Sequence, residues 1–357
     1  MRILHTIETR GPGGAEILIV NIAKYLSDNG YSIHGLFIKD GWIREKFMGS
    51  GYETCYYPLR KSYDISFPYT IYKFIKKHKI NLIHAHEFHN SLYASIIGLL
   101  TGVQTICTFH GKNYHCDSFR NRMIMKFISK ASKMVTVSED IKKQICSLAN
   151  INPSAINVIE NGVFIPERID KGYLKAELNL PDNSVLIGSV GRLSKVKGHT
   201  YLIEAAKKVV AGRPNIYFVI SGDGPDKNIL FNQIKRAGLS DKFFLLGNRN
   251  DISNILASLD IFVLPSLSEG TSLALLEAMC FEMPLIVTRV GNNPIILKNK
   301  PGNLLVDPAR VDDLIESILL MINKKAYAKK IKENAIFVKK YYSFERMMQN
   351  YLRLYLA

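Results

Sequence analysis

The stretch "IFVLPSLSEGTSLALLEAM", from Ile261 to Met279, joins a strand pattern directly to a helix pattern. The apolar run at its start predicts a buried strand, and "LALLEAM" consists of strong helix formers. Glu269 and Gly270 leave the strand, and Thr271 or Ser272 is placed to cap the helix. A strand that passes at once into a helix is typical of the repeating units of parallel sheets.

The same alternation of strand and helix patterns runs along the whole chain. Strand patterns in the first half are "RILHTIE", "SIHGLFI", "NLIHAHE", "TICTFHG", "MVTVSED" and "INVIENG". After a polar break near residues 165–184, new ones follow: "VLIGSVG", "IYFVISG", "KFFLLGN", "IFVLPS", "PLIVTRV" and "GNLLVD". The near-continuous apolar strands indicate parallel sheets covered on both faces. We therefore predict an α/β protein with two Rossmann-like domains, residues 1–165 and 184–342.

Ligands of open parallel sheets bind at the carboxyl ends of the strands. Two such domains that face each other would form a central cleft lined by those strand ends, so the residues there are the candidate site. A last helix is predicted from about Ser343 to Ala357, with aromatic and leucine residues available for packing.

Composition is that of an ordinary globular protein: 357 residues, 47% hydrophobic and 22% charged. No apolar run reaches the roughly 18 residues of a membrane span, and the apolar run in "MRILHTIETRG" is too short for a signal peptide. The five cysteines are scattered and no C-x-x-C pair occurs. We expect a reduced, cytoplasmic protein without a zinc site.

The net charge of +16 raises the question of an anionic partner. Residues 1–170 hold 21 basic and 14 acidic side chains, a net of +7, and the remaining 26 and 17 give +9. This even spread, without a reading motif, argues against a nucleic-acid binder. The segment Phe119–Lys133 alternates apolar with basic residues, which suits either an anionic membrane surface or a solvated helix face.

The loop "GPGGAE", residues Gly11 to Glu16, follows the first strand and is rich in glycine. Such a loop brings backbone amides close to a phosphate at a helix start. Glu16 stands where a dinucleotide fingerprint needs its third glycine, so that fingerprint fails. A tight turn explains the glycines equally well.

Histidines gather at two strand ends, in "HAHEFH" (His84, His86, His89) and in "TFHG" (His110). Alternation along the strand places His84 and His86 on one face. A metal site there would need further ligands, and no nearby cysteine completes a familiar set, so we expect no metal. His110 closes an apolar strand before a glycine, and we expect it at the functional site.

Two basic and two acidic residues complete the set of candidate functional-site residues. Arg192 and Lys197 follow the first strand of the second domain and could clamp a diphosphate. The free N–H groups from Gly270 to Leu273 would bind an anion. Glu269 and Glu277 could then accept hydrogen bonds from sugar and ribose hydroxyls on either side. The alternative is a capped helix with surface charges.

These residues together resemble the retaining GT-B-fold glycosyltransferases of family four, the glycosyl transferase group 1 enzymes. The motifs that carry the resemblance cover almost the whole chain; they are "GPGGAE", "TFHG", "TVSE", "VIENGV", "VGRLSKVKG", "SGDGP", "SEGTSLALLEAM" and the final "YYSFERMMQNYLRLY". The resemblance implies that the final helix, residues 343–357, crosses back to the N-terminal domain. It also implies that residues 1–165 bind the acceptor and residues 184–342 bind the nucleotide sugar.

The resemblance assigns roles residue by residue. His110 and Glu269 would be the catalytic residues beside the donor sugar, and His86 and Asn161 would lie on the acceptor side. The donor-binding residues would be Gly13, Gly14, Arg192, Lys197, Gly222, Asn248, Gly270, Thr271, Ser272, Leu273 and Glu277. One departure concerns "VGNNPIIL", where Ile295 stands at the position of an expected acid.

The predicted activity is transfer of a sugar from a nucleoside-diphosphate donor, with UDP-sugars expected, to a hydroxyl of a glycan or lipid-linked glycan in surface polysaccharide synthesis. The resemblance implies retention, and the sequence contains no Asp-x-Asp, so we expect neither a metal nor another cofactor. The expected location is cytoplasmic, peripheral on the inner face of a membrane. A nucleotide-sugar epimerase of the same fold and a non-catalytic sugar-binding protein are the open alternatives.

Overall fold

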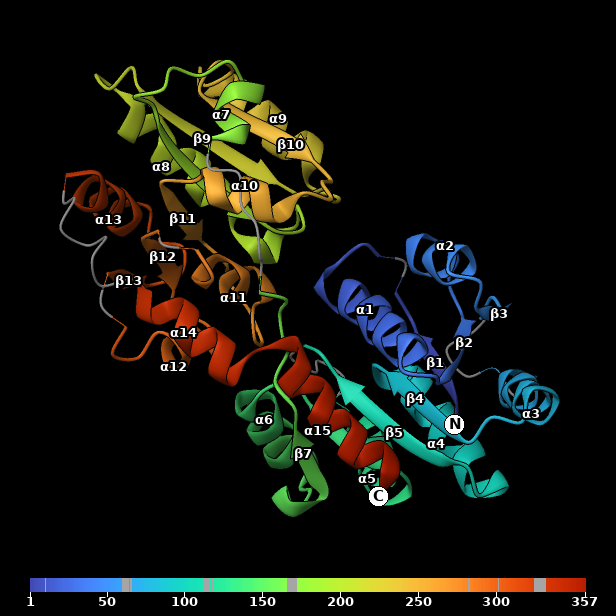
Figure 1. Cartoon of the computed structure of the whole chain (residues 1–357). Coiled ribbons are helices and arrows are strands. Elements are labelled where there is room, and N and C mark those ends of the chain that lie inside the picture. The colour runs from blue at the N-terminus through green and yellow to red at the C-terminus, as the bar shows by residue number, and fades with distance from the viewer. Residues whose placement is uncertain are drawn as a thin grey trace. The chain divides into compact units, whose positions relative to one another are not determined.

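The computed structural model divides into two compact units (Figure 1). Unit 1 comprises Met1–Asn161 and Met347–Ala357, and unit 2 comprises Gly162–Arg346. The residues that the structure describes are 1–9, 11–59, 64, 66–111, 116, 118–165, 172–281, 283–300, 302–323 and 332–357. Residues 166–171 of the polar break predicted between the domains therefore lie outside the described residues.

Unit 1 is built on a parallel sheet of seven strands in the order β3-β2-β1-β4-β5-β6-β7. The strands are β1 (Arg2–Ile7), β2 (Ser32–Phe37), β3 (Glu53–Tyr56), β4 (Leu82–His86), β5 (Gln104–Phe109), β6 (Lys133–Thr136) and β7 (Ile156–Val158). The central strands are buried along nearly their whole length, as both-face coverage requires.

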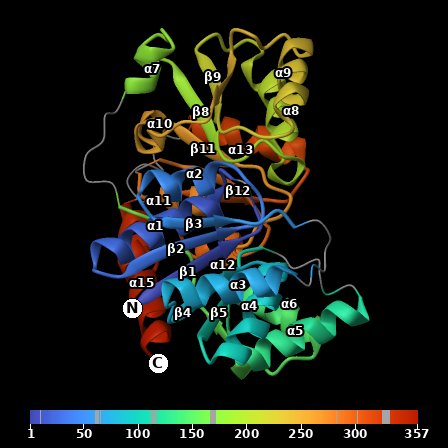
Figure 2. The ribbon, with the colours of Figure 1, turned by 90° about the vertical axis from the view of Figure 1, so that its right-hand side faces the viewer.

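The helices of unit 1 cover both faces of this sheet (Figure 2). They are α1 (Gly14–Asp28), α2 (Trp42–Gly49), α3 (Ser66–His78), α4 (Phe88–Thr101), α5 (Phe119–Ala131), α6 (Glu139–Ala149) and α15 (Phe344–Leu356). Helices α3 to α6 pack side by side in chain order, and their apolar faces form one core with Ile83, Ala85 and Cys107 of the sheet. Helices α1 and α2 contact each other.

Helix α15 returns the chain to unit 1 from Met347 onward. Its Tyr355 hydroxyl lies 2.7 Å from Nδ1 of His84, and its Tyr351 hydroxyl lies 3.4 Å from Oγ1 of Thr108. Both tyrosine rings are fully buried. Large aromatic surfaces with satisfied hydroxyls anchor the end of the chain on the sheet, which confirms the predicted crossing back of the last helix.

Unit 2 is built on a parallel sheet of six strands in the order β10-β9-β8-β11-β12-β13. The strands are β8 (Val185–Val190), β9 (Ile216–Ser221), β10 (Phe243–Gly247), β11 (Ile261–Leu264), β12 (Leu285–Thr288) and β13 (Asn303–Val306). The helices are α7 (Tyr173–Glu177), α8 (His199–Val210), α9 (Lys227–Arg236), α10 (Ile252–Ser258), α11 (Leu273–Met279), α12 (Asn293–Ile296), α13 (Val311–Asn323) and α14 (Lys332–Tyr341).

Two apolar cores sandwich the sheet of unit 2. One lies under α8, α9 and α13 and includes Ile187, Phe218 and Val263. The other includes Val219 and Phe262 of the same strands, with side chains of α10, α11 and α14. Neighbouring strand residues thus point to opposite faces and both faces are buried. The predicted α/β architecture of two Rossmann-like units is confirmed.

Each sheet has one point at which the strand order reverses direction. In unit 1 this switch point lies between β1 and β4, and in unit 2 between β8 and β11. Loops that leave adjacent strands at such a point diverge to opposite faces and leave room for a ligand. The functional residues are therefore to be sought after these four strands. Among the described residues, no helix is long and apolar enough to cross a bilayer.

Candidate active site

At the switch point of unit 2, the loops after β8 and β11 are joined through their backbones. The N–H of Leu267 donates to the carbonyl of Val196 at 2.7 Å. Gly198 has a φ of +66°, and a Cβ atom there would lie 2.1 Å from the carbonyl oxygen of Pro265. Only glycine permits this approach, which brings the cation predicted at residue 197 to the acid predicted at residue 269.

Lys197 and Glu269 form an ion pair, with Nζ 2.7 Å from Oε1. The Ser266 hydroxyl donates to the same oxygen at 2.6 Å. The Glu269 side chain is 8% exposed and that of Lys197 is 22% exposed, so solvent screens the pair little. An ammonium group has three donors. Lys197 can therefore hold Glu269 in place and still present N–H groups to a phosphate.

Arg192 and two further predicted donor-binding residues, Gly222 and Asn248, lie at the ends of neighbouring strands. Arg192 is exposed just after β8. Gly222 packs so tightly that a Cβ atom would lie 2.0 Å from the carbonyl oxygen of Gly191, and its N–H donates to Gly247 at 2.8 Å. Asn248 follows in an exposed position. The structure thus gathers Arg192, Gly222 and Asn248 at one edge of the sheet.

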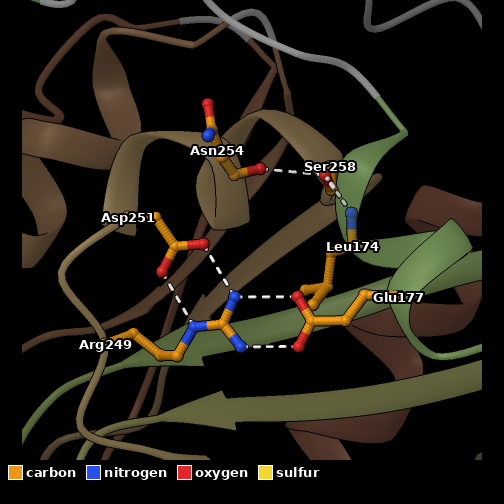
Figure 3. Close-up of polar contacts among 6 residues, drawn as sticks. All are labelled: Leu174, Glu177, Arg249, Asp251, Asn254 and Ser258. Atoms are coloured by element: carbon orange, nitrogen blue, oxygen red, sulfur yellow. Dashed lines mark hydrogen bonds and ion pairs between the residues drawn. The ribbon is translucent and has the colours of Figure 1, made fainter.

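The turn that carries Asn248 is fixed by Arg249 (Figure 3). The Arg249 guanidinium donates to both carboxylate oxygens of Glu177, at 2.6 and 2.8 Å, and to both oxygens of Asp251, at 2.8 and 2.7 Å. These bidentate contacts raise the pKa of Arg249 and lower the pKa values of both acids. Arg249 therefore links α7 to the turn before α10.

The predicted anion-binding loop is capped and braced. Ser272 is the N-cap of α11, and its Oγ accepts from the N–H of Leu275 at 3.4 Å. The loop after β12 supports it from the side, because Asn292 donates through its backbone N–H to Gly270 at 3.1 Å and through Nδ2 to Thr271 at 3.3 Å. The loop before Leu273 is thus held by contacts on both sides.

Glu277 lies on the next turn of α11 and is partly buried. Burial raises the pKa of its carboxyl group to about 7. Its charge is thus poorly solvated in the absence of a ligand. Hydroxyl groups that donate to it would replace the missing solvation, as the predicted ribose contact requires.

At the switch point of unit 1, an acid that the sequence analysis did not single out caps a helix. Glu8 follows β1, and its Oε1 accepts from the backbone N–H of His89 at 2.5 Å and of Asn90 at 3.2 Å. Its Oε2 lies 3.0 Å from Nδ1 of His89. Burial raises the pKa of Glu8, but the contacts with His89 and Asn90 outweigh it and leave the pKa lowered. Such a cap stabilises α4 by about 1 kcal/mol.

The predicted donor-binding glycines, Gly13 and Gly14, lie at the start of helix α1, which follows Glu8 in the chain. Gly13 is the N-cap of α1 without a side-chain hydrogen bond, and Gly14 is the first residue of the helix. A Cβ atom on Gly13 would lie 2.6 Å from Oε2 of the buried Glu16. The glycines therefore make room for a carboxylate of this chain, in addition to any approach of a ligand.

Four histidine rings form a cluster beneath the strand ends. His5, His84 and His86 are fully buried, with ring centroids 4.2–5.8 Å apart. Nδ1 of His86 lies 3.0 Å from Nε2 of the half-buried His110. Burial lowers the pKa of His5 to about 3 and that of His110 to about 4, and those of His84 and His86 well below the usual value. All four imidazoles are therefore neutral at pH 7.

His5, His84 and His86 each place one ring nitrogen within 4.8 Å of the others, the spacing of a possible metal site. Both ring nitrogens of His84 are already engaged, at 2.7 Å from Tyr355 and at 2.8 Å from Thr108. A metal would have to displace one of these hydroxyls from His84, which argues against a ligand set of three histidines. Both ring nitrogens of His5 and Nε2 of His86 are buried without a hydrogen-bond partner among the described residues. His86 is buried and contacts His110, and Asn161 is also buried, at 7% exposure.

The predicted site residues are divided between the two units. Arg192, Lys197, Gly222, Asn248, Gly270, Thr271, Ser272, Leu273, Glu269 and Glu277 belong to unit 2, and Gly13, Gly14, His86, His110 and Asn161 belong to unit 1. The sequence analysis overlooked the strand-end acids Glu8 and Glu87. Their position directly after an apolar strand was the available signal.

Comparison with known proteins identifies the family. The family model "Glycosyl transferases group 1" matches residues 170–337, and "Glycosyltransferase Family 4" matches residues 12–165. The chain is 34% identical over 271 residues to the Escherichia coli UDP-Gal:alpha-D-GlcNAc-diphosphoundecaprenol alpha-1,3-galactosyltransferase, covering 72% of this chain and 70% of that protein. It is 22% identical to the Bacillus anthracis N-acetyl-alpha-D-glucosaminyl L-malate synthase over 90% of this chain and 88% of that protein.

Solved structures share the fold over the full length. A glycosyltransferase from Rickettsia africae superposes with a TM-score of 0.86 at 22% identity, covering 99% of this chain and 97% of that one. The Anabaena protein HepE in complex with UDP-glucose superposes with a TM-score of 0.85 at 20% identity, covering 99% of both chains. The chain belongs to the glycosyl transferases of group 1, family four, and has their GT-B fold. It is a glycosyltransferase, as the motifs predicted.

Proposed function

We propose that this chain transfers a hexose from a UDP-sugar to a hydroxyl group of a glycan carried on a lipid diphosphate, in the synthesis of a surface polysaccharide. The observation that carries the proposal is the charge arrangement in unit 2. A cation paired with a buried acid, Lys197 with Glu269, lies at the switch point, and the poorly solvated Glu277 lies two turns further along the chain. The UDP-galactose and diphosphoundecaprenol in the name of the Escherichia coli relative support the choice of donor and acceptor.

Each group has a distinct role in this reaction. Lys197 and Arg192 stabilise the charge that grows on the diphosphate as it leaves, and Glu277 accepts the ribose hydroxyls. Glu269, held by Ser266 and Lys197, orients the donor sugar. The acceptor oxygen bonds to the anomeric carbon on the face from which the diphosphate departs. Its proton passes to the leaving phosphate oxygen, so the configuration is retained and UDP is released.

The same arrangement supports transfer without a metal ion. A metal in this class of reaction would neutralise the leaving diphosphate. Here two cationic side chains, Arg192 and Lys197, are available at the strand end for that purpose. The histidines His5, His84 and His86 of unit 1 offer no alternative for this role, because their side chains are buried.

We also propose that unit 1 attaches reversibly to an anionic membrane surface, on the cytoplasmic face where a lipid-linked acceptor would be presented. Helix α5 buries Met125 and Ile128 in the core of unit 1. It exposes Phe119 at 79% and Met123 at 50%, beside exposed Arg120, Arg122 and Lys130. Each basic side chain near an anionic surface contributes about 1 kcal/mol, so a few suffice for reversible attachment.

Transfer is tested with a donor screen. Calorimetry with UDP, GDP and ADP is followed by assays with UDP-galactose, UDP-glucose and a GlcNAc-diphosphate-lipid acceptor. We expect UDP to bind best and one UDP-sugar to give an acceptor product with retained configuration. Preferential binding of GDP or ADP would contradict the choice of donor. Epimerised sugar from the donor alone would favour the epimerase alternative.

Membrane attachment is tested by co-sedimentation with phosphatidylglycerol vesicles and with phosphatidylcholine vesicles. Binding should occur only to the anionic vesicles, and should weaken with salt and on replacing Arg120, Arg122, Lys126 and Lys130 with Gln. A matched control replaces four exposed basic residues of unit 2, Lys207, Lys208, Lys235 and Arg236, with Gln. Equal loss in both variants would mean that total charge, not helix α5, determines binding.

A further inference from the structure

Glu87 has a backbone conformation that side chains rarely adopt. Its φ of 68° and ψ of 178° lie in a region that is essentially restricted to glycine. The surroundings hold it there, because its N–H donates to the carbonyl of Thr108 at 3.1 Å and its carbonyl accepts from the N–H of Ser91 at 3.1 Å. Strain of this kind is concentrated at active sites and ligand clamps.

The start of helix α4 does not require a glutamate at this position. Glu87 is the N-cap of α4, but its side chain makes no capping hydrogen bond. Glu8 provides the cap from the end of β1, through the N–H groups of His89 and Asn90. A glycine at residue 87 would adopt the same backbone conformation without strain. The carboxyl group therefore has no role in starting the helix that would explain the strain.

The carboxyl group of Glu87 lies at the site that the topology assigns to a ligand. It follows β4 directly, and Glu8 follows β1, so the two acids flank the switch point of unit 1. Burial and the nearby charges of Glu8 and Glu16 raise the pKa of Glu87 to about 7, against a backbone hydrogen bond from His110. Near neutral pH the group is partly protonated, and it both donates and accepts hydrogen bonds.

We propose that Glu87 binds the acceptor, through a hydroxyl group of the acceptor sugar next to the one that is glycosylated. This inference rests on the proposed function and assigns to unit 1 a residue that selects the acceptor. Three acids converge at this edge, Glu8, Glu16 and Glu87, and they would repel a phosphate placed beside them. An uncharged sugar hydroxyl meets no such repulsion, and the carboxyl group gives it a charge-assisted partner.

The test separates strain from recognition with Glu87→Gly and Glu87→Gln. Glu87→Gly removes the carboxyl group and relieves the backbone, so its melting temperature should equal or exceed that of wild type. Its kcat/KM for the acceptor should fall at least tenfold. UDP affinity and acceptor-independent hydrolysis of the UDP-sugar should stay at wild-type values, because the proposed reaction assigns the diphosphate, ribose and donor-sugar contacts to Arg192, Lys197, Glu269 and Glu277. Glu87→Gln keeps a hydrogen-bonding group, so its kcat/KM for the acceptor should lie between those of wild type and Glu87→Gly.

The matched control is Lys79→Gly. Lys79 is an exposed residue of unit 1 with a φ of 51°, so this change relieves a positive φ away from the site. Its melting temperature should rise while its acceptor kinetics stay at the wild-type values. A series of deoxy acceptors adds a second readout: one missing hydroxyl should slow wild type but should not slow Glu87→Gly further.

The outcomes distinguish the two proposals. Wild-type acceptor kinetics in Glu87→Gly, with an active wild type, would overturn the assignment of Glu87 alone. A marked loss of stability in Glu87→Gly would show that the side chain supports the fold and would also overturn it. A wild-type enzyme that transfers no sugar from any UDP-sugar would overturn both the proposed function and this inference.

Discussion

The two switch points of this protein have the same topology but opposite chemistry. In unit 2, the acid after β11, Glu269, is neutralised by Lys197, and Arg192 is exposed nearby. In unit 1, the acid after β4, Glu87, has two further acids as its charged neighbours among the described residues, Glu8 and Glu16. One strand edge thus suits an anion, and the other suits an uncharged hydroxyl group. A shared fold sets where a ligand binds, and the charges of a few side chains set which ligand it is.

The largest expected effect tests the cationic side of this comparison. Lys197→Ala removes the partner of Glu269 and a cation at the leaving diphosphate, so kcat should fall by roughly 10²–10³-fold, about 2.7–4 kcal/mol. Steady-state kinetics with the best UDP-sugar measure it. Lys195→Ala is the matched control, because Lys195 is exposed on the same short 3₁₀ helix, Lys195–Lys197. Equal losses in both variants would place the effect outside the Lys197–Glu269 pair.

The second prediction separates the two acids of unit 2. Glu277→Ala should weaken UDP binding by roughly 1.5–3 kcal/mol, because the ribose loses a charged acceptor. Glu269→Ala should instead reduce turnover more than UDP affinity, since Glu269 is assigned to the sugar. Calorimetry with UDP, alongside kinetics, measures both. If UDP bound far more weakly to the Glu269 variant than to the Glu277 variant, the two assignments would be reversed.

The alternation of strand and helix patterns in the sequence was sufficient to predict both sheets, but not every strand. The alternation of apolar runs predicted β1, β2 and β4 to β13, whereas β3, Glu53–Tyr56, was not identified. This strand lies at the sheet edge with no fully buried residue, so it lacks the apolar run that marks the others. Periodicity reports burial, and a half-exposed edge strand carries little of that signal.

The candidate site could be predicted only in part, for a related reason. Residues next to one another in sequence, such as those from Glu269 to Leu273, could be placed from the strand end and the cap alone. The capping of α4 by Glu8 joins residues about eighty positions apart, and the Lys197–Glu269 pair joins residues 72 apart. Such contacts depend on which strands are neighbours, which a single sequence does not reveal. The strained backbone of Glu87 depends on them too.

The third prediction concerns acid stability and the histidine cluster of unit 1. Burial lowers the pKa of His5 to about 3, below the unfolded value of 6.5. Its contribution to stability is therefore present above pH 6.5 and is lost as the pH falls towards 3. At pH 5.5, one unit below the unfolded pKa, this loss is about 1.4 kcal/mol. The raised pKa values of Glu87 and Glu277 act in the opposite direction between about pH 4.5 and 7.

A variant isolates the histidine effect from that of the acids. His5→Phe removes one buried titrating group and keeps a ring beside Phe47, whose centroid lies 6.3 Å away. The difference in unfolding free energy between pH 7.5 and 5.5 should be smaller in this variant than in wild type by about 1.4 kcal/mol. Urea unfolding at the two pH values measures it. An unchanged difference would mean that His5 does not titrate on unfolding as its burial requires.

The smallest expected effect is that of EDTA on transfer, which we expect to be none. The cations at the leaving diphosphate are Lys197 and Arg192, so removal of divalent ions should leave kcat within about twofold of its value, below 0.5 kcal/mol. The assay compares wild type with Lys197→Ala, with and without added magnesium.

Partial rescue of the variant by magnesium would show that a metal can replace the missing charge, which sharpens the role of Lys197. Complete loss of wild-type activity on chelation, restored by magnesium or manganese, would contradict charge stabilisation by side chains. Restoration of that activity by zinc instead would indicate a metal site at His5, His84 and His86. The contrast between an anion-binding strand edge in unit 2 and a hydroxyl-binding strand edge in unit 1 would then be wrong.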